Sequence, residues 1–308
     1  MIARAIAAAA AVAQPKIVAV VPPEHRLVEG VASDGHTIWV SSVLDRQILA
    51  CTDACRPIAT LPEGLHPLGI AWDWSRKLLW IAADCPDLPG VPKCSRGALV
   101  ALSATGKLRG RLAPPLEFHP GDVSASLHGI FVSDSRNGLV YALLNGRREL
   151  RAINRPGDGK SAQGAVLAAS GTKVIVADYS RGIGSIDLKT TDTSWLPLPG
   201  GKPLRGVDGL VRCGDSYFGV YNGSSPARIM SIRVHPGGVD ATNMLSGRAL
   251  LDPTQIAFDG KRLLVVANAG WEAASKPDGR RTAGAPILAF AYYGQRVGAG
   301  LDLVQHES

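Results

Sequence analysis

Five cysteines have the clearest potential for covalent chemistry, and four of them form two pairs that are close in the sequence. Three residues separate Cys51 from Cys55, and eight separate Cys85 from Cys94. In an oxidising compartment each pair would form a disulfide that closes a short loop. The alternative is a four-thiolate zinc site, but zinc sites favour cysteine pairs separated by two residues. We therefore predict two local disulfides, and we expect the fifth cysteine, Cys213, to be a buried thiol.

Carboxylates and amides beside short apolar runs could bind a cation or take part in acid–base chemistry. Glu29 and Asp208 each precede a glycine near the start of such a run. A buried carboxylate is costly unless it is paired with a metal or a base, so both are candidates for a ligand site. Side chains of this kind near strand ends more commonly hold turns through bonds to the backbone. Five of them are nevertheless candidates for substrate contact: Asp122, Asp134, Asp178, Gln255 and Asn268.

These candidates belong to a segment that recurs six times along the chain. The copies occupy residues 28–42, 67–83, 120–134, 162–178, 207–221 and 253–268. Each copy contains a short strand, a polar turn that is often built on Asp-Gly, and a second strand rich in β-branched and aromatic residues. Further strands follow, and four strands in about 40–50 residues are typical of a propeller blade.

The repeat predicts an all-β fold, a six-bladed β-propeller. A pair of β-sandwiches with coincidental turn spacing is the alternative. A propeller must close its ring, because an open array of blades would leave two sheet edges bare. We therefore expect residues 16–21 to form the outer strand of the last blade, next to residues 286–293.

Composition agrees with this fold and excludes other classes. The chain has 308 residues, is 46% hydrophobic, and contains 35 glycines and 21 prolines, which disfavours long helices. No internal run is long and apolar enough to predict a membrane span. The net charge of +7 comes from dispersed basic residues, so we expect no nucleic-acid partner. We expect a monomer that binds a small molecule.

The first thirteen residues resemble a secretory signal. One arginine precedes an Ala/Ile/Val stretch that ends in small residues before Gln14-Pro15. We predict a signal peptide over residues 1–13, a single propeller domain over 14–308, and a periplasmic or secreted location. The alternative is an Ala-rich helix at the start of a cytosolic protein.

At the level of family, the chain resembles the six-bladed calcium-dependent phosphotriesterase superfamily, which includes gluconolactonase and regucalcin. The resemblance rests on residues 29–32 with 38–40, on Val207-Asp208-Gly209, and on the strand ends at Asp134 and Asp178. Strictosidine synthase-like and NHL-repeat propellers are also similar. The resemblance covers nearly the whole chain past the signal, and its motifs are more specific for the fold than for the activity.

The resemblance implies a divalent metal, with calcium expected, at one mouth of the central channel. The family holds its metal with a Glu from the first blade, an Asn from the fourth and an Asp from the fifth. Those positions are Glu29, Gln163 and Asp208 in this chain, and the Asp is also the candidate catalytic acid or base. Two carboxylates and an amide oxygen suit a hard cation. The implied chemistry is hydrolysis of a lactone or a small ester.

Several positions depart from the family pattern. Gln163 is one methylene longer than the family Asn, and Leu68 stands where paraoxonase-like members have a catalytic His. Gln255 stands near the catalytic Glu of strictosidine synthase, which argues against that activity. The histidines at 66 and 119 are expected to be structural hydrogen-bonding residues. The sequence of residues 268–281 predicts a long loop. Trp271 in this loop would form a lid or a stacking platform; the alternative is an ordinary surface loop.

Two functions remain open on the sequence. The first is an exported metal-dependent hydrolase of a lactone or related small ester. The second is a non-catalytic, NHL-like propeller that binds a ligand or a protein partner. The test is geometric, since the metal site requires the oxygens of Glu29, Gln163 and Asp208 to converge.

Overall fold

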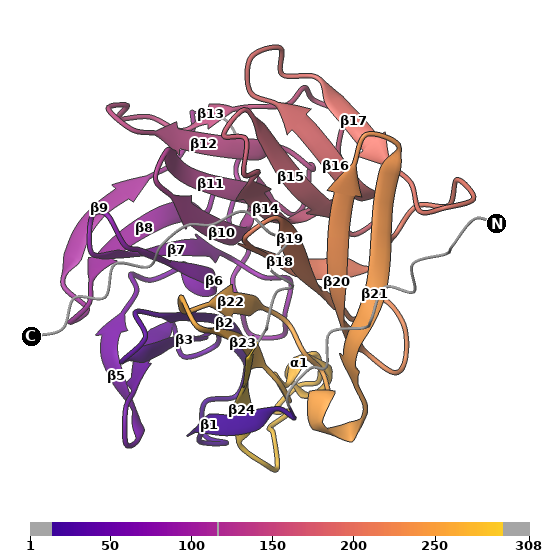
Figure 1. Cartoon of the computed structure of the whole chain (residues 1–308). Helices are drawn as coiled ribbons and strands as arrows, with labels where there is room; N and C mark the ends of the chain where they lie inside the picture. Colours follow the sequence, from indigo (N-terminus) through magenta and orange to yellow (C-terminus); the bar gives the residue numbers. More distant parts are fainter. Residues whose placement is uncertain (1–13, 116, 292–308) are drawn as a thin grey trace, which may run out of the picture.

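Six four-stranded antiparallel sheets surround a central channel in the computed structural model, which describes residues 14–115 and 117–291 (Figure 1). This arrangement confirms the predicted six-bladed β-propeller. The four strands of each blade lie side by side from the centre of the ring outwards, so one strand of every blade lies at the centre and one at the rim. The innermost strands run from one mouth of the channel to the other.

The strands of each blade follow one another outwards from the channel. The innermost strands are β2 (Val28–Ser33), β6 (His66–Asp73), β10 (Pro120–Ser126), β14 (Ala162–Leu167), β18 (Val207–Cys213) and β22 (Ile256–Phe258). The second strands are β3 (Ile38–Ser42), β7 (Leu78–Asp84), β11 (Gly129–Asp134), β15 (Lys173–Asp178), β19 (Ser216–Tyr221) and β23 (Arg262–Val266). The third strands are β4 (Gln47–Cys51), β8 (Ala98–Ser103), β12 (Val140–Leu144), β16 (Gly182–Asp187), β20 (Arg228–His235) and β24 (Ala285–Ala291).

The outer strands complete the blades, and the first strand of the chain closes the ring. Five outer strands are β5 (Cys55–Thr60), β9 (Leu108–Leu112), β13 (Arg151–Ala152), β17 (Thr193–Leu196) and β21 (Gly238–Ser246). The sixth is β1 (Lys16–Val21), which pairs antiparallel with β24. The predicted ring closure is therefore confirmed as far as Ala291. The signal expected over 1–13 and the residues after 291 lie outside the described part of the chain.

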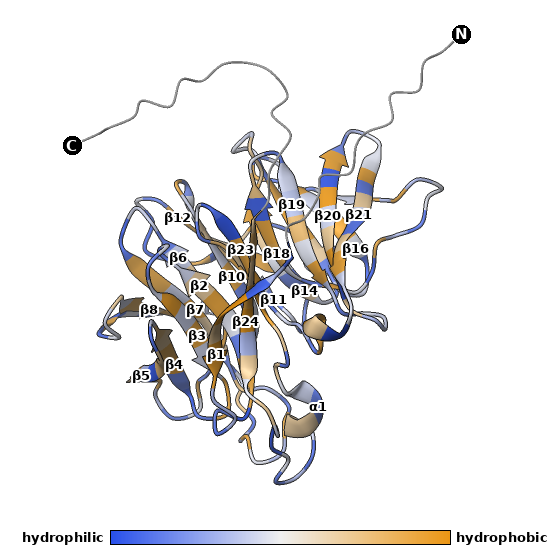
Figure 2. Ribbon diagram, turned by 60° about the horizontal axis from the view of Figure 1, so that its bottom comes forward, coloured by the Kyte–Doolittle hydropathy of each residue, from blue (hydrophilic) through white to orange (hydrophobic). Residues whose placement is uncertain are grey.

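Apolar side chains fill the spaces between neighbouring blades. Six clusters of buried residues each draw their members from two adjacent blades. Between the first and second blades, Trp39 stacks on Trp72 with ring centroids 4.8 Å apart. Figure 2 shows the hydrophobic colour concentrated along the strands. The ring is thus held together by side-chain burial between sheets, because the sheets share no strand.

Both predicted disulfides are present. Cys51 bonds Cys55 across the β4–β5 turn, and Cys85 bonds Cys94 at the ends of the loop between β7 and β8. Cys213 is free as expected, but at the end of β18 it is only half-buried. Burial still raises the pKa of its thiol.

A bulge interrupts the start of the innermost strand in the first five blades. In the first blade the register shifts between Val28 and Val31, and in the fifth between Val207 and Leu210. Blades two to four have the same irregularity at the same place. Bulges redirect side chains and are common beside functional sites. The repeat therefore turns one or two residues per blade towards the channel at the mouth where these strands begin.

Two short helical segments lie outside the blades, a 3₁₀ turn (Arg248–Leu250) and α1 (Trp271–Ala274). No helix in the described residues has the length and apolar character needed to cross a membrane.

Candidate functional site

The bulged residues enclose a small cavity of about 10 Å³ at the mouth where the innermost strands begin, which we call the upper mouth. All three residues of the expected metal site line it. The complete lining is Glu29, Gly69, Gly121, Asp122, Gln163, Asp208, Gly209, Thr254 and Gln255. Every blade contributes at least one residue, so the beginnings of the six innermost strands, five of them bulged, bring together side chains that are far apart in the sequence.

Glycines at the bulges allow neighbouring innermost strands to approach one another. A Cβ added at Gly69 would lie 2.7 Å from the Asp122 Cα, and one at Gly209 would lie 2.9 Å from the Gln255 Cα. Neither separation is compatible with a side chain. The recurring glycines that precede or follow the site residues therefore set the narrowness of the cavity.

Three acidic side chains line this cavity, and no basic side chain does. Glu29, Asp122 and Asp208 come from the first, third and fifth blades, and none of them forms an ion pair within the described residues. The pKa of Glu29 is raised well above its usual range, first by burial and then by the charge of Asp208. Burial raises the pKa of Asp122 to about 8 and that of Asp208 to about 6. The site is therefore short of positive charge.

Neutral donors orient the three carboxylates. The indole nitrogen of Trp271 donates to Glu29 Oε2 at 2.6 Å, and Asn222 Nδ2 donates to Asp208 Oδ2 at 2.8 Å. The amide of Gln255 donates to Asp122 Oδ1. Because these partners carry no charge, they fix the directions of the carboxylates without neutralising them.

Trp271 reaches Glu29 from α1, so the loop for which a lid, a stacking platform and an ordinary surface loop were all left open contacts the upper mouth. Asp252 holds the start of α1, because its Oδ2 accepts from the backbone nitrogens of Gly270 and Trp271 at 2.7 and 2.9 Å. This role of Asp252 could not be predicted from the sequence, because the residue lies outside the recognised strand–turn–strand segments.

Gln163 stands in place of the shorter family asparagine, and its amide lies between Ser161 and Gly121. Its Nε2 donates to Ser161 Oγ at 3.2 Å. Its Oε1 lies beside Gly121, where an added Cβ would stand 3.4 Å from that oxygen. The extra methylene therefore leaves the amide oxygen at the cavity wall.

The donor set at the upper mouth fits a calcium-like cation. Two carboxylates and an amide oxygen are hard ligands, and the excess negative charge would be offset by a divalent ion. Glu29, Gln163 and Asp208 would hold such an ion, with the carboxyl of Asp122 in the same cavity wall.

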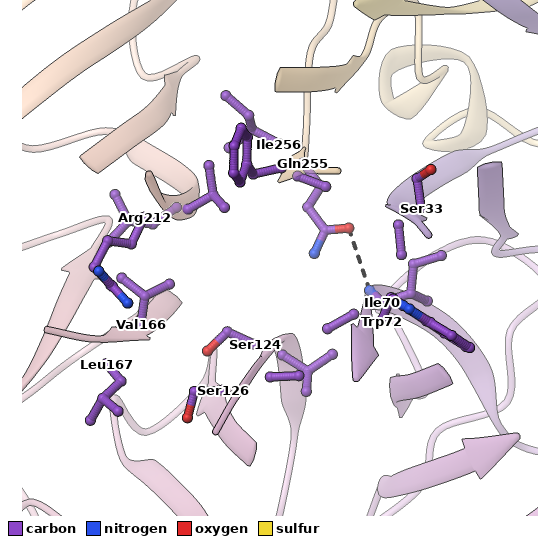
Figure 3. A pocket seen from close by; sticks show the side chains of 18 of the residues that line it. Ser33, Ile70, Trp72, Ser124, Ser126, Val166, Leu167, Arg212, Gln255 and Ile256 are labelled. Atoms are coloured by element: carbon purple, nitrogen blue, oxygen red, sulfur yellow. Dashed lines mark hydrogen bonds between the residues drawn. The ribbon is translucent and has the colours of Figure 1, made fainter. Parts of the chain in front are cut away.

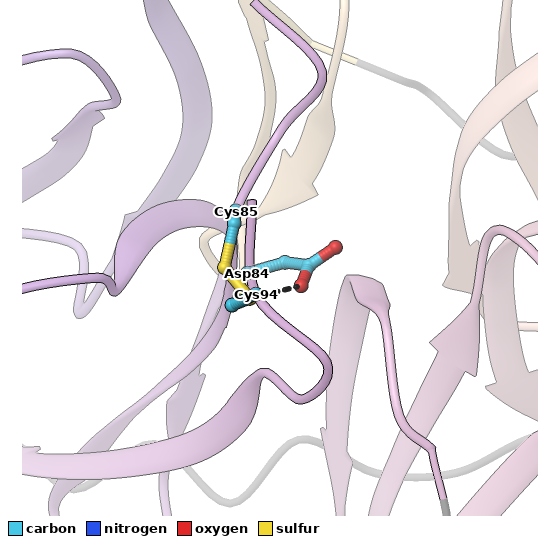
Figure 4. Close-up of side chains that lie close together, drawn as sticks. All are labelled: Asp84, Cys85 and Cys94. Atoms are coloured by element: carbon cyan, nitrogen blue, oxygen red, sulfur yellow. Dashed lines mark hydrogen bonds between the residues drawn. A yellow bond between two sulfur atoms is a disulfide. The ribbon is translucent and has the colours of Figure 1, made fainter. Parts of the chain in front are cut away.

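A second cluster contains residue types that bind metals, but its two cysteines are joined in a disulfide. In the described part of the chain, only Asp84, Cys85 and Cys94 form a group of at least three His, Cys, Asp or Glu residues whose ligand atoms lie within 4.8 Å of one another. Figure 4 shows the two sulfurs bonded to each other, with Asp84 beside them. Sulfurs joined in this way are not thiolate ligands.

Three of the candidates for substrate contact lie away from the cavity. Both oxygens of Asp134 and both of Asp178 accept hydrogen bonds from backbone nitrogens, four in total for Asp178. Asn268 donates to the carbonyl of Gly284 at 3.0 Å. These side chains hold turns, which is the common role of such residues at strand ends. Only Asp122 and Gln255 of the five candidates line the cavity.

The two histidines have structural partners. His66 Nδ1 donates to the carbonyl of Val43 at 2.8 Å, as expected for a structural residue. His119 is buried between Asp84, 3.0 Å from Nδ1, and Glu117, 2.9 Å from Nε2.

A larger pocket of about 580 Å³ adjoins the carboxylates on the side of the fifth and sixth blades. Asn222 belongs to its wall and also bonds Asp208, so it connects pocket and cavity. Asn222 Oδ1 and Ser224 Oγ are buried here and have no hydrogen-bond partner. On the opposite side, Leu88 of the disulfide loop packs with Leu68 and Ala274. Access to Asp208 is therefore expected through the pocket.

Comparisons with known proteins support the fold. No protein-family model matches the sequence. No curated protein matches it either. Among solved structures, a gluconolactonase from Xanthomonas campestris is 15% identical with a TM-score of 0.59, and the match covers 92% of this chain and 98% of that one. A luciferin-regenerating enzyme is 13% identical with a TM-score of 0.61, covering 91% and 96%.

A third structure shows how widely the activities differ on this fold. A PQQ-bound aldose sugar dehydrogenase from Streptomyces coelicolor is 11% identical with a TM-score of 0.59, covering 90% of this chain and 98% of that one. The resemblance to gluconolactonase-like six-bladed propellers is thus confirmed for the fold. At these identities the activity has to be argued from the site.

Proposed function

We propose that this protein is a metal-dependent hydrolase of a lactone or a related small ester. The observation that supports the proposal most strongly is that Glu29, Gln163 and Asp208 line one cavity, where the carboxylates form no ion pair with any described residue. Two buried carboxylates that repel each other would destabilise the fold unless something offsets their charge. A bound divalent cation, calcium by its preference for oxygen ligands, offsets it.

The metal would be held by Glu29, Gln163 and Asp208. When bound, it would polarise the carbonyl of the lactone and stabilise negative charge on that oxygen. Asp122, whose pKa is raised to about 8, would raise the affinity where the pH or the bound cation ionises its carboxyl, without being a ligand.

Asp208 is the candidate general base. Its pKa is raised to about 6, so at neutral pH the carboxylate is mostly ionised and can accept a proton from the attacking water. Asn222 keeps one oxygen of Asp208 in place by donating to it at 2.8 Å. The same amide presents a buried, unpartnered Oδ1 beside the unpartnered Ser224 Oγ, and these two atoms would bind hydroxyl groups of the substrate.

A periplasmic or secreted location fits the two disulfides, which persist in oxidising compartments. We propose export through the segment 1–13 and a monomeric state. Detection of the mature protein in a periplasmic fraction, starting near residue 14, would support export.

The proposal is tested by metal content and turnover together. The protein is purified without chelators, analysed for metals, and assayed on a panel of sugar lactones and small esters. Asp208→Asn is compared with Asp215→Asn, an exposed aspartate at the far end of the same hairpin. We expect bound divalent metal and turnover in the wild type and in Asp215→Asn, and loss of turnover in Asp208→Asn. Turnover that survives Asp208→Asn would refute the assignment.

A non-catalytic propeller is the second candidate. It is favoured by Leu68, which places an apolar side chain where paraoxonase-like members have a histidine, and by the indole that occupies one oxygen of Glu29. Bound metal with no turnover on any ester would select this function.

A further inference from the structure

The channel has a second concave site at its other end, where the innermost strands finish. We call this end the lower mouth. Its pocket has a volume of about 240 Å³, and its wall includes Trp72, Trp74, Ser126, Arg212 and Phe258. Figure 3 shows residues of several blades around the opening, with Arg212 and Trp72 on opposite sides. No residue proposed to hold the metal belongs to this pocket.

Gln255 separates the lower mouth from the carboxylates. Its Oε1 accepts from the backbone nitrogen of Val31 at 2.7 Å, and its amide donates to Asp122 Oδ1. The side chain is 5% exposed and belongs to the walls of both the cavity and the pocket. A ligand in the lower mouth is therefore kept from the upper mouth by a hydrogen-bonded side chain.

Apolar strand residues interrupted by Ser33, Ser124 and Ser126 line the lower mouth, together with one charged residue. Val123, Val166, Leu210 and Ile256 face the pocket from four different blades. Arg212 is its only charged lining residue and makes no ion pair with any described residue. A single cation in a mouth whose other lining residues are uncharged favours a monoanion over a multiply charged ligand, and the apolar residues of the wall suit a partly apolar body.

Two tryptophans line one side of the pocket, and the indole N–H of one of them has no hydrogen-bond acceptor among the described residues. Trp72 is 8% exposed, and its indole nitrogen has no hydrogen-bond partner. Buried indole N–H groups normally have an acceptor, so a ligand oxygen would remove a penalty here. Trp74 is 47% exposed and packs edge-on against Trp72 with ring centroids 6.5 Å apart. A large exposed indole at a rim is suited to stacking on a flat ring.

We propose that the lower mouth binds a small aryl carboxylate that carries an oxygen at the far end of its ring. The carboxylate pairs with Arg212, the ring packs against the apolar walls and Trp74, and the far oxygen accepts from Trp72 Nε1. The two ends of the ligand match the opposite positions of Arg212 and Trp72 in Figure 3. This binding site is independent of the hydrolytic proposal, because it uses other residues and another mouth.

The probe is 4-hydroxyphenylacetate, titrated into the full protein by calorimetry and by tryptophan fluorescence. We expect binding by the wild type, weakened at least about tenfold in Arg212→Gln because a charged hydrogen bond is lost. Arg233→Gln, which changes an exposed arginine of the same blade, is the matched control and should bind like the wild type. The neutral 4-hydroxyphenylacetamide should bind the wild type at least about tenfold more weakly than the acid.

Two further measurements distinguish ligand binding at the lower mouth from effects at the upper mouth. Trp72→Phe, checked for folding by its melting temperature, should lower affinity for 4-hydroxyphenylacetate more than for phenylacetate, which lacks the far oxygen. Asp208→Asn and chelator treatment should leave binding unchanged. The proposal is overturned by absence of binding at millimolar probe, by equal affinity in Arg212→Gln and wild type, or by loss of binding in Asp208→Asn.

Discussion

The two mouths of one channel differ in charge, packing and hydrogen bonding, although the same six strands form both. At the upper mouth the strands begin with bulges that turn Glu29, Asp122 and Asp208 into a cavity of about 10 Å³. At the lower mouth the ladders are regular and enclose a pocket of about 240 Å³ that is lined by apolar residues, three serines and one cation. The bulge thus allows one repeat to present polar side chains at one end and apolar ones at the other.

This contrast implies that the two ends can be changed separately, because they share the inter-blade packing and, of their lining residues, only Gln255. Trp39 belongs to that shared packing. Its ring is 1% exposed and stacks between the first two blades. Trp39→Ala should lower the free energy of unfolding by about 3–5 kcal/mol, since it leaves a large cavity. Chemical denaturation measures the loss, and Trp74→Ala, which removes a half-exposed ring, should cost much less. Equal losses would show that the blade interface does not dominate stability.

Removal of the Asp208 carboxylate should affect the upper mouth alone. We expect Asp208→Asn to lower kcat for lactone hydrolysis by at least about 10²-fold, the contribution typical of a general base. Steady-state kinetics give this number, and binding of 4-hydroxyphenylacetate serves as the internal control. A variant that loses function at both mouths would show that they are coupled through Gln255.

The charge at the upper mouth should appear in the pH dependence of stability. The pKa of Asp122 is about 8 in the folded protein and about 4 in the unfolded chain, so the folded state binds more protons between these values. The metal-free protein should therefore lose stability as pH rises from about 4 to 8. Asp122→Asn should flatten that slope in melting experiments, while Arg212→Gln should not. An unchanged slope in Asp122→Asn would contradict the assignment of the shift to this group.

A smaller effect is expected from the indole above Glu29. The hydrogen bond from Trp271 stabilises the ionised carboxylate and lowers its pKa, so Trp271→Phe should raise that pKa further. Protons then compete better with a cation, and calcium affinity should fall several-fold at pH 7 and less at pH 9. Calorimetry at both pH values measures the change. A loss of affinity that is the same at both would indicate a steric role for the ring.

The fold was accessible from the sequence because its determinants are local and repeated. The hairpin pattern predicted the blades, the first strand predicted ring closure, and the spacing of four cysteines predicted both disulfides. The bulges were not predicted, because register depends on how two strands pair. The difference between Asp122, which lines the cavity, and Asp134, which holds a turn, depends on the same register.

Contacts between loops that are far apart in the sequence were the hardest feature of the structure to predict. Trp271 bonds Glu29 across 242 positions of the chain, and Asp252 holds the helix that carries this indole. Neither contact leaves a periodic pattern. The lower mouth was also missed, because its walls are ordinary apolar strand residues whose only distinguishing member is Arg212.

Calcium titration of the chelator-treated protein tests the central claim that the upper mouth is a metal site. Isothermal calorimetry should give one site per chain in the wild type and in Asp215→Asn. Glu29→Gln and Asp208→Asn should bind at least about tenfold more weakly, because each removes a charged ligand. Absence of binding in the wild type, or unchanged affinity in both carboxylate variants, would contradict the account.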